Sequence, residues 1–196
     1  MSSGFSVCVY CGSRNGARPA YLQLARRLGQ AIGQRGWQLV YGGGRAGLMG
    51  EVADAALAAG ARVIGVIPES LMRLEVGHAG LSELHVVQTM HQRKQLMAER
   101  ADAFLALPGG IGTFEELFEV WTWRHLDYHR RPIGLLDAED YYTGLMDFLR
   151  RSREEGFLSE AQMQMIQHGA EPEPMLDALY AAREPAAVSP PPLDRI

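Results

Sequence analysis

The segment "AFLALPGGIGTFEE", residues 103–116, gives the strongest indication of the fold. Its first six residues are apolar and have the length of a buried strand, and a helical pattern begins near Thr113. Between them lie Gly109, Gly110 and Gly112, where the backbone can approach a ligand closely. A strand that ends in a glycine-rich turn and continues into a helix is typical of phosphate-binding turns.

The same alternation of short apolar runs and longer helical patterns extends along the chain. We expect strands at residues 5–10, 37–42, 61–68, 83–88, 103–108 and 131–137. We expect helices at residues 20–34, 49–59, 90–101, 113–127, 140–154, 159–167 and 172–183. This order predicts an α/β, Rossmann-like, doubly wound and mostly parallel sheet with helices on both faces. We expect one nucleotide-binding catalytic domain at residues 1–183 and a Pro-rich C-terminal tail at residues 184–196.

Composition restricts the class of protein. A chain of 196 residues with 47% hydrophobic and 21% charged residues has enough apolar side chains for a continuous core. The net charge of −4 argues against a nucleic-acid partner, which usually leaves a basic footprint. No segment resembles a signal peptide, and no apolar run approaches the roughly 18 residues of a membrane span. We therefore expect a cytoplasmic protein without a membrane partner.

Two patterns resemble metal or redox sites but have simpler interpretations. Cys8 and Cys11 stand three apart on an expected strand, so their side chains point to opposite faces and are expected to be buried thiols. His125 and His129 are four apart on an expected helix, but no third ligand accompanies them, which favours an exposed or interface pair. We expect no metal.

Three expected strands end in glycine-bearing turns, at Gly12–Ser13, Gly42–Gly44 and Gly109–Gly112. In parallel sheets, ligands bind beyond the carboxyl ends of the strands, so three such turns at one edge suggest close contact with a ligand. "GGGRAG" (42–47) also fits the dinucleotide fingerprint G-x-G-x-x-G. That match is weak because consecutive glycines satisfy several spacings and because the run follows the second strand. A dinucleotide-dependent oxidoreductase is nevertheless one alternative.

The two glutamates after the third turn have structural explanations of their own. If Thr113 caps the helix, Thr113 and Glu116 form a capping box, which contributes about 1 kcal/mol without any chemistry. Glu115 would then be favoured by the helix dipole. With those roles alone, the chain would be a non-catalytic nucleotide-binding module, which is a second alternative.

Electrostatics requires cations beside these glutamates if the turn binds phosphate. A carboxylate ~5 Å from one phosphate charge costs about 3 kcal/mol at an effective dielectric constant of 20. The segment "MHQRKQ" supplies Arg93 and Lys94, and Lys94 is the single lysine in the chain. Arg93 can hold a carboxylate in a planar fork, while Lys94 can meet the phosphate as a point charge. The acid would then face the sugar.

Together these motifs resemble one known family. "PGGIGTFEE" and "MHQRK", with 23 residues from Arg93 to Glu116, and the stretches "VYCGSR" and "VYGGGRAGLMG" are similar to the Lonely Guy family of cytokinin-activating phosphoribohydrolases. The resemblance covers about residues 5–180. The departures are Ile111, where an aromatic residue is frequent, and Phe114, which replaces a common leucine; both concern the fit of the substrate.

The resemblance implies a Rossmann-like fold, usually a homodimer, and no cofactor. It implies hydrolysis of the N-glycosidic bond of AMP or N6-prenylated AMP to a free base and ribose 5-phosphate. By it, Arg93 and Glu116 are catalytic, and Glu75, Lys94, the 110–115 loop and Thr122 contact the substrate. The full set of expected substrate-binding residues is Gly12, Ser13, Gly43, Gly44, Glu75, Met90, Lys94, Gly109, Gly110, Ile111, Gly112, Thr113, Phe114, Glu115 and Thr122.

Older labels call such proteins lysine decarboxylases, whose chemistry needs a lysine Schiff base to pyridoxal phosphate. Lys94 is the only candidate, and its place beside Arg93 suits anion binding better. By analogy with glycoside hydrolysis, Glu116 is expected to stabilise the oxocarbenium-like centre or to orient water. The helix with sequence "FEELFEVWTWRHLDY" (114–128) is apolar nearly all round, so we expect it to be buried on several sides, by a second subunit or by the core.

Overall fold

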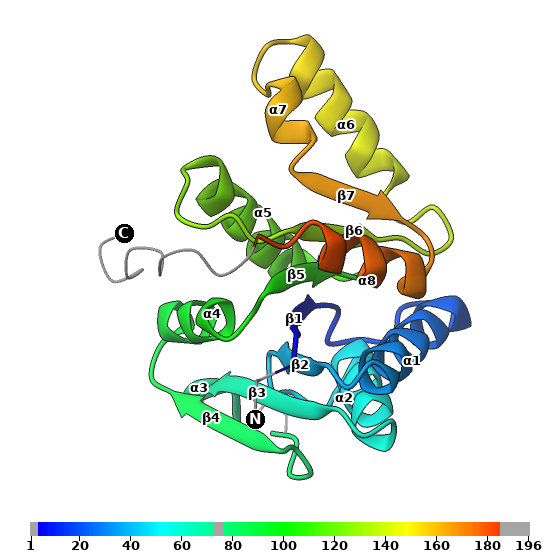
Figure 1. The fold of residues 1–196 in the computed structure, drawn as a ribbon, viewed down its shortest axis with the longest axis vertical. Coiled ribbons are helices and arrows are strands. Elements are labelled where there is room, and N and C mark those ends of the chain that lie inside the picture. Colours follow the sequence, from blue (N-terminus) through cyan, green and yellow to red (C-terminus); the bar gives the residue numbers. More distant parts are fainter. Residues whose placement is uncertain (1–3, 73–76, 185–196) are drawn as a thin grey trace.

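Seven parallel strands form a single sheet in the computed structural model, which describes residues 4–72 and 77–184 (Figure 1). The strand order is β4-β3-β2-β1-β5-β6-β7. The predicted α/β architecture is confirmed, and every strand pair is parallel. The strands are β1 (Ser6–Tyr10), β2 (Gln38–Tyr41), β3 (Arg62–Pro68), β4 (Glu83–Val87), β5 (Ala103–Ala106), β6 (Ile133–Leu136) and β7 (Ile166–Gly169).

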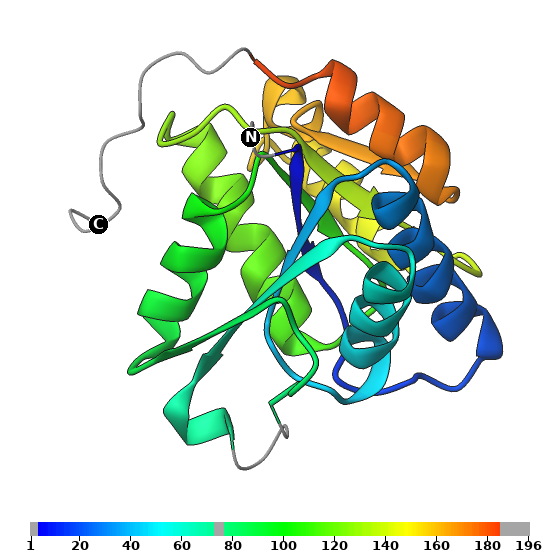
Figure 2. The ribbon, with the colours of Figure 1, turned by 60° about the horizontal axis from the view of Figure 1, so that its bottom comes forward.

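Helices cover both faces of the sheet. Figure 2 shows α1, α2 and α8 on one side of it and α4 and α5 on the other. The helices are α1 (Pro19–Gln34), α2 (Gly47–Ala58), α3 (Glu69–Met72), α4 (Met90–Glu99), α5 (Ile111–His125), α6 (Thr143–Glu154), α7 (Glu160–Met163) and α8 (Pro172–Ala181). No helix in the described ranges has both the length and the apolar content that crossing a membrane requires.

The two faces of the sheet have separate cores because side chains alternate along each strand. In β1, Val7 and Val9 belong to the core under α1, α2 and α8, whereas Cys8 and Tyr10 belong to the core under α4 and α5. The interpretation of Cys8 and Cys11 as buried thiols on opposite faces is confirmed. Burial raises the pKa of both thiols well above the usual value.

The C-terminal region corrects one predicted element. The helix expected at residues 159–167 is instead the single turn α7 followed by β7, which pairs with β6 from Ile133↔Ile166 to Leu136↔Gly169. The sequence of β7, "IQHG", is short and half polar, so no apolar run marks it as a strand. Its pairing with β6 supplies backbone hydrogen bonds that local sequence does not encode. Of the tail expected at residues 184–196, all but Glu184 lies outside the described residues.

Helix α5 is buried along one face. Only Thr113, Leu117, Val120 and Trp121 are buried, so one face of the helix is covered in the isolated chain. Phe118 and Leu126 are exposed apolar side chains on the other faces. The core of one chain therefore covers one face of α5, and cover of the other faces by a second subunit stays a prediction.

The order of the strands fixes where the chain changes direction. From β1 the chain moves outward through β2, β3 and β4, and it then returns to the opposite side of β1 as β5. The switch point therefore lies between β1 and β5. Loops that leave the carboxyl ends of two such strands diverge to opposite faces, which opens a crevice where ligands bind in this class of sheet.

Candidate active site

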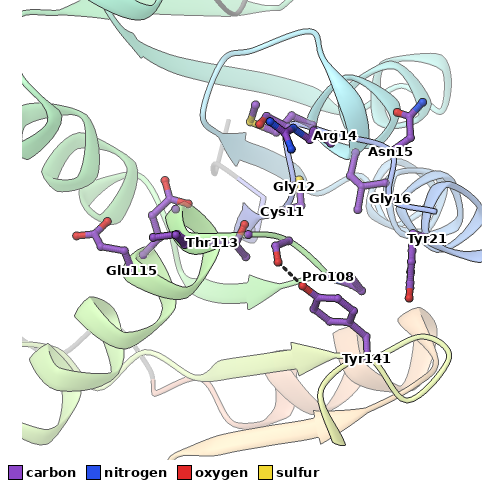
Figure 3. A pocket seen from close by; sticks show the side chains of 18 of the residues that line it. Cys11, Gly12, Arg14, Asn15, Gly16, Tyr21, Pro108, Thr113, Glu115 and Tyr141 are labelled. Carbon is purple, nitrogen blue, oxygen red and sulfur yellow. Dashed lines mark hydrogen bonds between the residues drawn. The ribbon is translucent and has the colours of Figure 1, made fainter. Parts of the chain in front are cut away.

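A cavity of about 580 Å³ opens at this switch point (Figure 3). The glycine loop after β5 crosses it, with Glu115 toward one end and Tyr21 and Tyr141 at the other (Figure 3). Its volume is typical of sites for small ligands. The sequence-predicted residues that line it are Gly12, Ser13, Met90, Arg93, Gly109, Gly110, Ile111, Gly112, Thr113, Glu115 and Glu116.

The glycines of the loop have two different reasons to be glycine. A Cβ atom at Gly109 would lie 2.1 Å from Thr113 Oγ1 and 2.9 Å from the amide nitrogen of Gly12, so the fold itself excludes a side chain there. A Cβ atom at Gly110 or Gly112 would meet nothing within 4 Å. Both residues line the cavity, so the missing side chains leave space for a ligand rather than for protein.

The loop after β1 is fastened to the glycine loop. The amide of Gly12 donates to the carbonyl oxygen of Pro108 over 3.1 Å, and the amide of Leu48 donates to Gly12 over 3.0 Å. These bonds bring the starts of α2 and α5 together at the cavity. Neither helix has a side-chain cap or an acidic residue in its first turn, so both present amide groups and the positive end of a dipole.

Arg93 is buried in the wall of the cavity. Its Nε donates to the carbonyl oxygen of Val66 over 3.1 Å, and its Nη2 donates to that of Gly42 over 2.9 Å. Nη1 lies 3.9 Å from Met90 Sδ. The guanidinium is therefore held in one orientation by carbonyl groups at the ends of β2 and β3. Pairing of Arg93 with Glu116 stays a prediction.

The structure places Lys94 away from the cavity. Its Nζ lies 2.5 Å from Glu115 Oε1 and 2.9 Å from Glu119 Oε1, and only 8% of the residue is exposed. Burial by itself lowers the pKa of Lys94, but the two glutamates outweigh burial and raise it. The expectation that Lys94 meets the phosphate loses its basis, because the ammonium is already neutralised by α5. Its pairing instead connects α4 to α5.

The helix boundary removes the simplest structural explanation of Glu116. Helix α5 begins at Ile111 with Gly110 as its N-cap, so Thr113 is not the cap and the expected capping box is wrong. Thr113 is buried, and its Oγ1 packs over Gly109. Glu116 stands in the second turn of α5, half-buried in the cavity wall. The catalytic role of Glu116 stays a prediction.

Besides Lys94, four expected substrate contacts lie off this cavity: Gly43, Gly44, Phe114 and Thr122. Gly43, with φ of 75°, packs against Ile67 and Leu84, and Gly44 forms an isolated bridge with Gly77. The glycine run after β2 thus serves the fold of that turn, which removes the basis of the dinucleotide fingerprint. The other two, Phe114 and Thr122, lie on α5.

Phe114 packs edge-on against Tyr142, with ring centroids 6.3 Å apart, on the core side of α5. Thr122 is exposed on α5, where its Oγ1 donates to the carbonyl oxygen of Phe118. The remaining expected contact, Glu75, lies outside the described residues.

Sequence reasoning missed a group of cavity residues; five of them stand inside the quoted motifs without being singled out, and the others lie outside any motif. Arg14 and Arg93 are the cationic side chains among the described residues of the cavity wall, and Arg14 is exposed there. Tyr141 comes from the β6–α6 connection, which tertiary folding brings to the loop. The missed lining residues are Cys11, Arg14, Asn15, Gly16, Tyr21, Leu48, Met49, Pro108 and Tyr141.

The histidine pair is not arranged as expected. Helix α5 ends at His125, and His129 is buried beyond it. His129 Nε2 lies 2.9 Å from the carbonyl oxygen of Val120, and Nδ1 accepts from the amide of Arg131. Both ring nitrogens are therefore used by the main chain, which makes His129 a neutral structural side chain. Burial lowers its pKa from 6.5 to about 4.

Comparisons with known proteins identify the family of this chain. Residues 49–179 match a family model described as "Possible lysine decarboxylase". A cytokinin riboside 5′-monophosphate phosphoribohydrolase of Rhodococcoides fascians is 53% identical over 157 residues, which cover 80% of this chain and 79% of the relative. A phosphoribohydrolase of the same name from Arabidopsis thaliana is 48% identical over 160 residues, covering 82% and 74%. The chain belongs to the Lonely Guy family of phosphoribohydrolases.

Solved structures extend the likeness of fold beyond the Lonely Guy family. The molybdenum cofactor binding protein of Rippkaea orientalis has a TM-score of 0.71 at 20% identity, covering 92% of this chain and 98% of that one. The Moco carrier protein of Chlamydomonas reinhardtii has a TM-score of 0.67 at 19% identity, covering 91% and 97%. At such identity these likenesses concern the fold alone.

The decarboxylase description of the family model does not fit the cavity of this Lonely Guy family member. A Schiff base requires a lysine amine at the ligand. The single lysine of the chain, Lys94, is buried against two glutamates and does not line the cavity. The residues present suit an anionic ligand that carries a glycosidic bond.

Proposed function

We propose that this chain hydrolyses the N-glycosidic bond of adenosine-type nucleoside 5′-monophosphates, AMP or N6-prenylated AMP, to a free base and ribose 5-phosphate. With the prenylated substrate this reaction activates a cytokinin. One observation carries the proposal: Glu116, Arg93 and the amides at the start of α5 line one cavity at the switch point of the sheet. The names of relatives that are about half identical support the same reaction.

The phosphate end of the substrate needs donors and positive charge. The amides of Gly110 and the first turn of α5 supply the donors, and two bare glycine positions leave room for the phosphate. Arg14, in the loop after β1, supplies the cation. It takes the role that the sequence analysis had assigned to Lys94. Binding energy at this remote group positions the sugar.

The reacting end of the substrate faces the carboxylate. Departure of the base leaves positive charge on the anomeric carbon, and Glu116 stabilises that charge or orients the attacking water. Arg93, whose guanidinium is fixed by the carbonyl groups of Val66 and Gly42, lines the same cavity and is the candidate cation for that carboxylate. The leaving base takes up a proton in the same step, from water or from a side chain.

The test is product chromatography after incubation with AMP, N6-prenylated AMP and other nucleoside monophosphates. We expect adenine-type base and ribose 5-phosphate in equal amounts. Glu116→Gln should lower kcat by a factor of about 10²–10⁴ while the thermal unfolding midpoint stays close to that of the wild type. Glu99→Gln, at the far end of α4, is the matched control. Binding of AMP without any product would favour the non-catalytic module.

We further propose a homodimer that covers α4 and α5. These two helices and the residue after α5 carry exposed apolar side chains: Met90, Ile111, Phe118 and Leu126. Ile111 is 85% exposed and lines the cavity, so a second chain on this surface would also close the site. Phe118→Glu should convert a dimer into a monomer in light scattering after gel filtration. A wild-type monomer at micromolar concentration would rule the dimer out.

We also infer a cytoplasmic location. Its support is that both cysteines of the chain, Cys8 and Cys11, are free thiols, as is usual in a reducing compartment. Cell fractionation with an antibody to the native protein tests the location, and recovery in a secreted or membrane fraction would contradict it.

A further inference from the structure

In the glycine loop after β5, the four carbonyl groups from Leu107 to Gly110 each accept a hydrogen bond. The carbonyl oxygen of Leu107 accepts from the hydroxyl of Tyr142 over 2.6 Å, and that of Pro108 accepts from the amide of Gly12 over 3.1 Å. The carbonyl oxygen of Gly110 accepts from the amide of Phe114, within α5. Each of these three bonds comes from the main chain or from a buried side chain.

The fourth carbonyl group is held differently. The carbonyl oxygen of Gly109 lies 2.5 Å from the hydroxyl of Tyr141, which donates to it (Figure 3). Tyr141 is 38% exposed and lines the cavity itself, so this bond stands between the loop and solvent. Burial raises the pKa of Tyr141, which keeps the hydroxyl protonated as a donor.

This bond sets the direction of an amide in the loop. In a planar trans peptide the C=O and N–H groups point in opposite directions, and the described chain contains only trans peptides. Fixing the carbonyl of Gly109 therefore fixes the amide of Gly110, which is the N-cap of α5. A carbonyl oxygen turned toward a phosphate would repel it, so the same bond also prevents that arrangement.

The segment that carries Tyr141 is built to hold it. Glu139 and Asp140 both have φ of 57°, a left-handed conformation that costs about 1 kcal/mol or more for a residue with a side chain. Glu139 pairs with Arg18 before α1, at 3.1 Å. The ring of Tyr141 contacts Tyr21 and Tyr142 edge-on, with centroids 5.7 and 4.9 Å away. Strain of this kind persists where the surrounding contacts determine the conformation.

We infer that Tyr141 is a positioning residue of the phosphate-binding loop, which orients the Gly109–Gly110 peptide for the 5′-phosphate of the substrate. The inference depends on the proposed function only in taking the ligand of the loop to be a sugar phosphate. Tyr141 acts through the loop rather than on the glycosidic bond. Its loss therefore weakens binding of the phosphate group and leaves the chemical step nearly unchanged.

The experiment compares Tyr141→Phe with Tyr180→Phe. Tyr180 lies on α8, is 40% exposed, and its hydroxyl donates no hydrogen bond within the described residues, so it is a control matched in exposure. Calorimetry measures the binding of ribose 5-phosphate, and kinetics with AMP separate KM from kcat. Thermal unfolding reports on the fold, which the conservative loss of one partly exposed hydroxyl should leave intact.

We expect Tyr141→Phe to weaken ribose 5-phosphate about tenfold and to raise KM by a similar factor, with kcat within about twofold of the wild type. Tyr180→Phe should match the wild type in all three measurements. Unchanged affinity in Tyr141→Phe would overturn the inference, as would a wild type that does not bind ribose 5-phosphate. A third outcome separates the inference from the proposed reaction. If the wild type binds ribose 5-phosphate but releases no base from AMP, and Tyr141→Phe binds ribose 5-phosphate more weakly, the inference is supported and the proposed reaction is refuted.

Discussion

The Nη2 atom of Arg93 lies 2.9 Å from the carbonyl oxygen of Gly42, one residue beyond the end of β2. A Cβ atom at position 42 would lie 2.0 Å from the same nitrogen. The glycine therefore gives the guanidinium both its acceptor and its space. Two residues 51 positions apart in the sequence thus form one part of the site, and the mutual dependence can be tested without touching Arg93.

Gly42→Ala should displace the guanidinium and leave the fold in place. The new methyl group meets the flexible end of a side chain first, so the side chain moves rather than the backbone. A displacement of about 1 Å at a positioned group can cost a factor of about 100 in rate, and we expect such a loss in kcat/KM for AMP. Kinetics and thermal unfolding measure the two effects. Wild-type kcat/KM in a folded Gly42→Ala protein would contradict this account of Arg93.

Gly112→Ala and Gly144→Ala form a matched pair. Each glycine is the second residue of its helix, α5 or α6, and a Cβ atom at either meets nothing within 4 Å, but only Gly112 lines the cavity. Alanine favours a helix over glycine by up to about 1 kcal/mol, so neither variant should be less stable. Only Gly112→Ala should weaken ribose 5-phosphate, by about tenfold or more. Equal affinity in the two variants would show that the phosphate does not use this turn.

Lys94→Gln and Arg14→Gln should separate a structural cation from a ligand-binding one. Removing the buried Lys94 leaves Glu115 and Glu119 without their shared cation, and we expect a loss of about 1–3 kcal/mol in the free energy of unfolding. When Glu115 and Glu119 are both replaced by glutamine, Lys94→Gln should lower the free energy of unfolding by less, because no carboxylates are left without a cation. Arg14→Gln should keep stability and weaken ribose 5-phosphate. Denaturant titrations measure stability, and calorimetry measures affinity. If Lys94→Gln weakened ribose 5-phosphate and Arg14→Gln lowered stability, Lys94 rather than Arg14 would be the cation that binds the phosphate.

Acid should destabilise the fold through His129. Above pH 6.5 its imidazole is neutral in the folded and unfolded chain, so it has no effect on the pH dependence. Burial lowers the folded pKa to about 4, so between pH 6.5 and about 4 only the unfolded chain takes up the proton. The free energy of unfolding should then fall with decreasing pH, by about 3 kcal/mol at most from this group.

Urea titrations at pH 7 and pH 4.5 measure that change. His129→Gln keeps a polar side chain that does not titrate. Its free energy of unfolding should therefore change less between pH 7 and pH 4.5 than that of the wild type, because most of the loss attributed to His129 is absent. His125→Gln, on the exposed end of α5, is the control. An equal loss of stability in wild type and His129→Gln would assign acid sensitivity to other groups.

Local sequence determined the class of fold and the identity of the key loop. Apolar runs of strand length between helical patterns were enough for a parallel α/β sheet, because burial on both faces makes such strands continuously apolar. The glycine motif at 108–116, its spacing from Arg93 and the two stretches at 9–14 and 40–50 were enough for the family, because close approach of backbone segments restricts the residues of such turns. The sequence analysis did not predict β7, because its four residues are half polar and the strand is stabilised by pairing with β6.

Tertiary structure alone decided which charges face the ligand. Lys94 and Arg93 are neighbours in sequence, yet Lys94 pairs with Glu115 and Glu119, whereas Arg93 donates to the carbonyl groups of Gly42, beyond β2, and Val66, within β3. Tyr141 reaches Gly109 across 32 positions of sequence. Such contacts depend on how strands are ordered in the sheet, and that order is set by the packing of the whole chain rather than by any one segment.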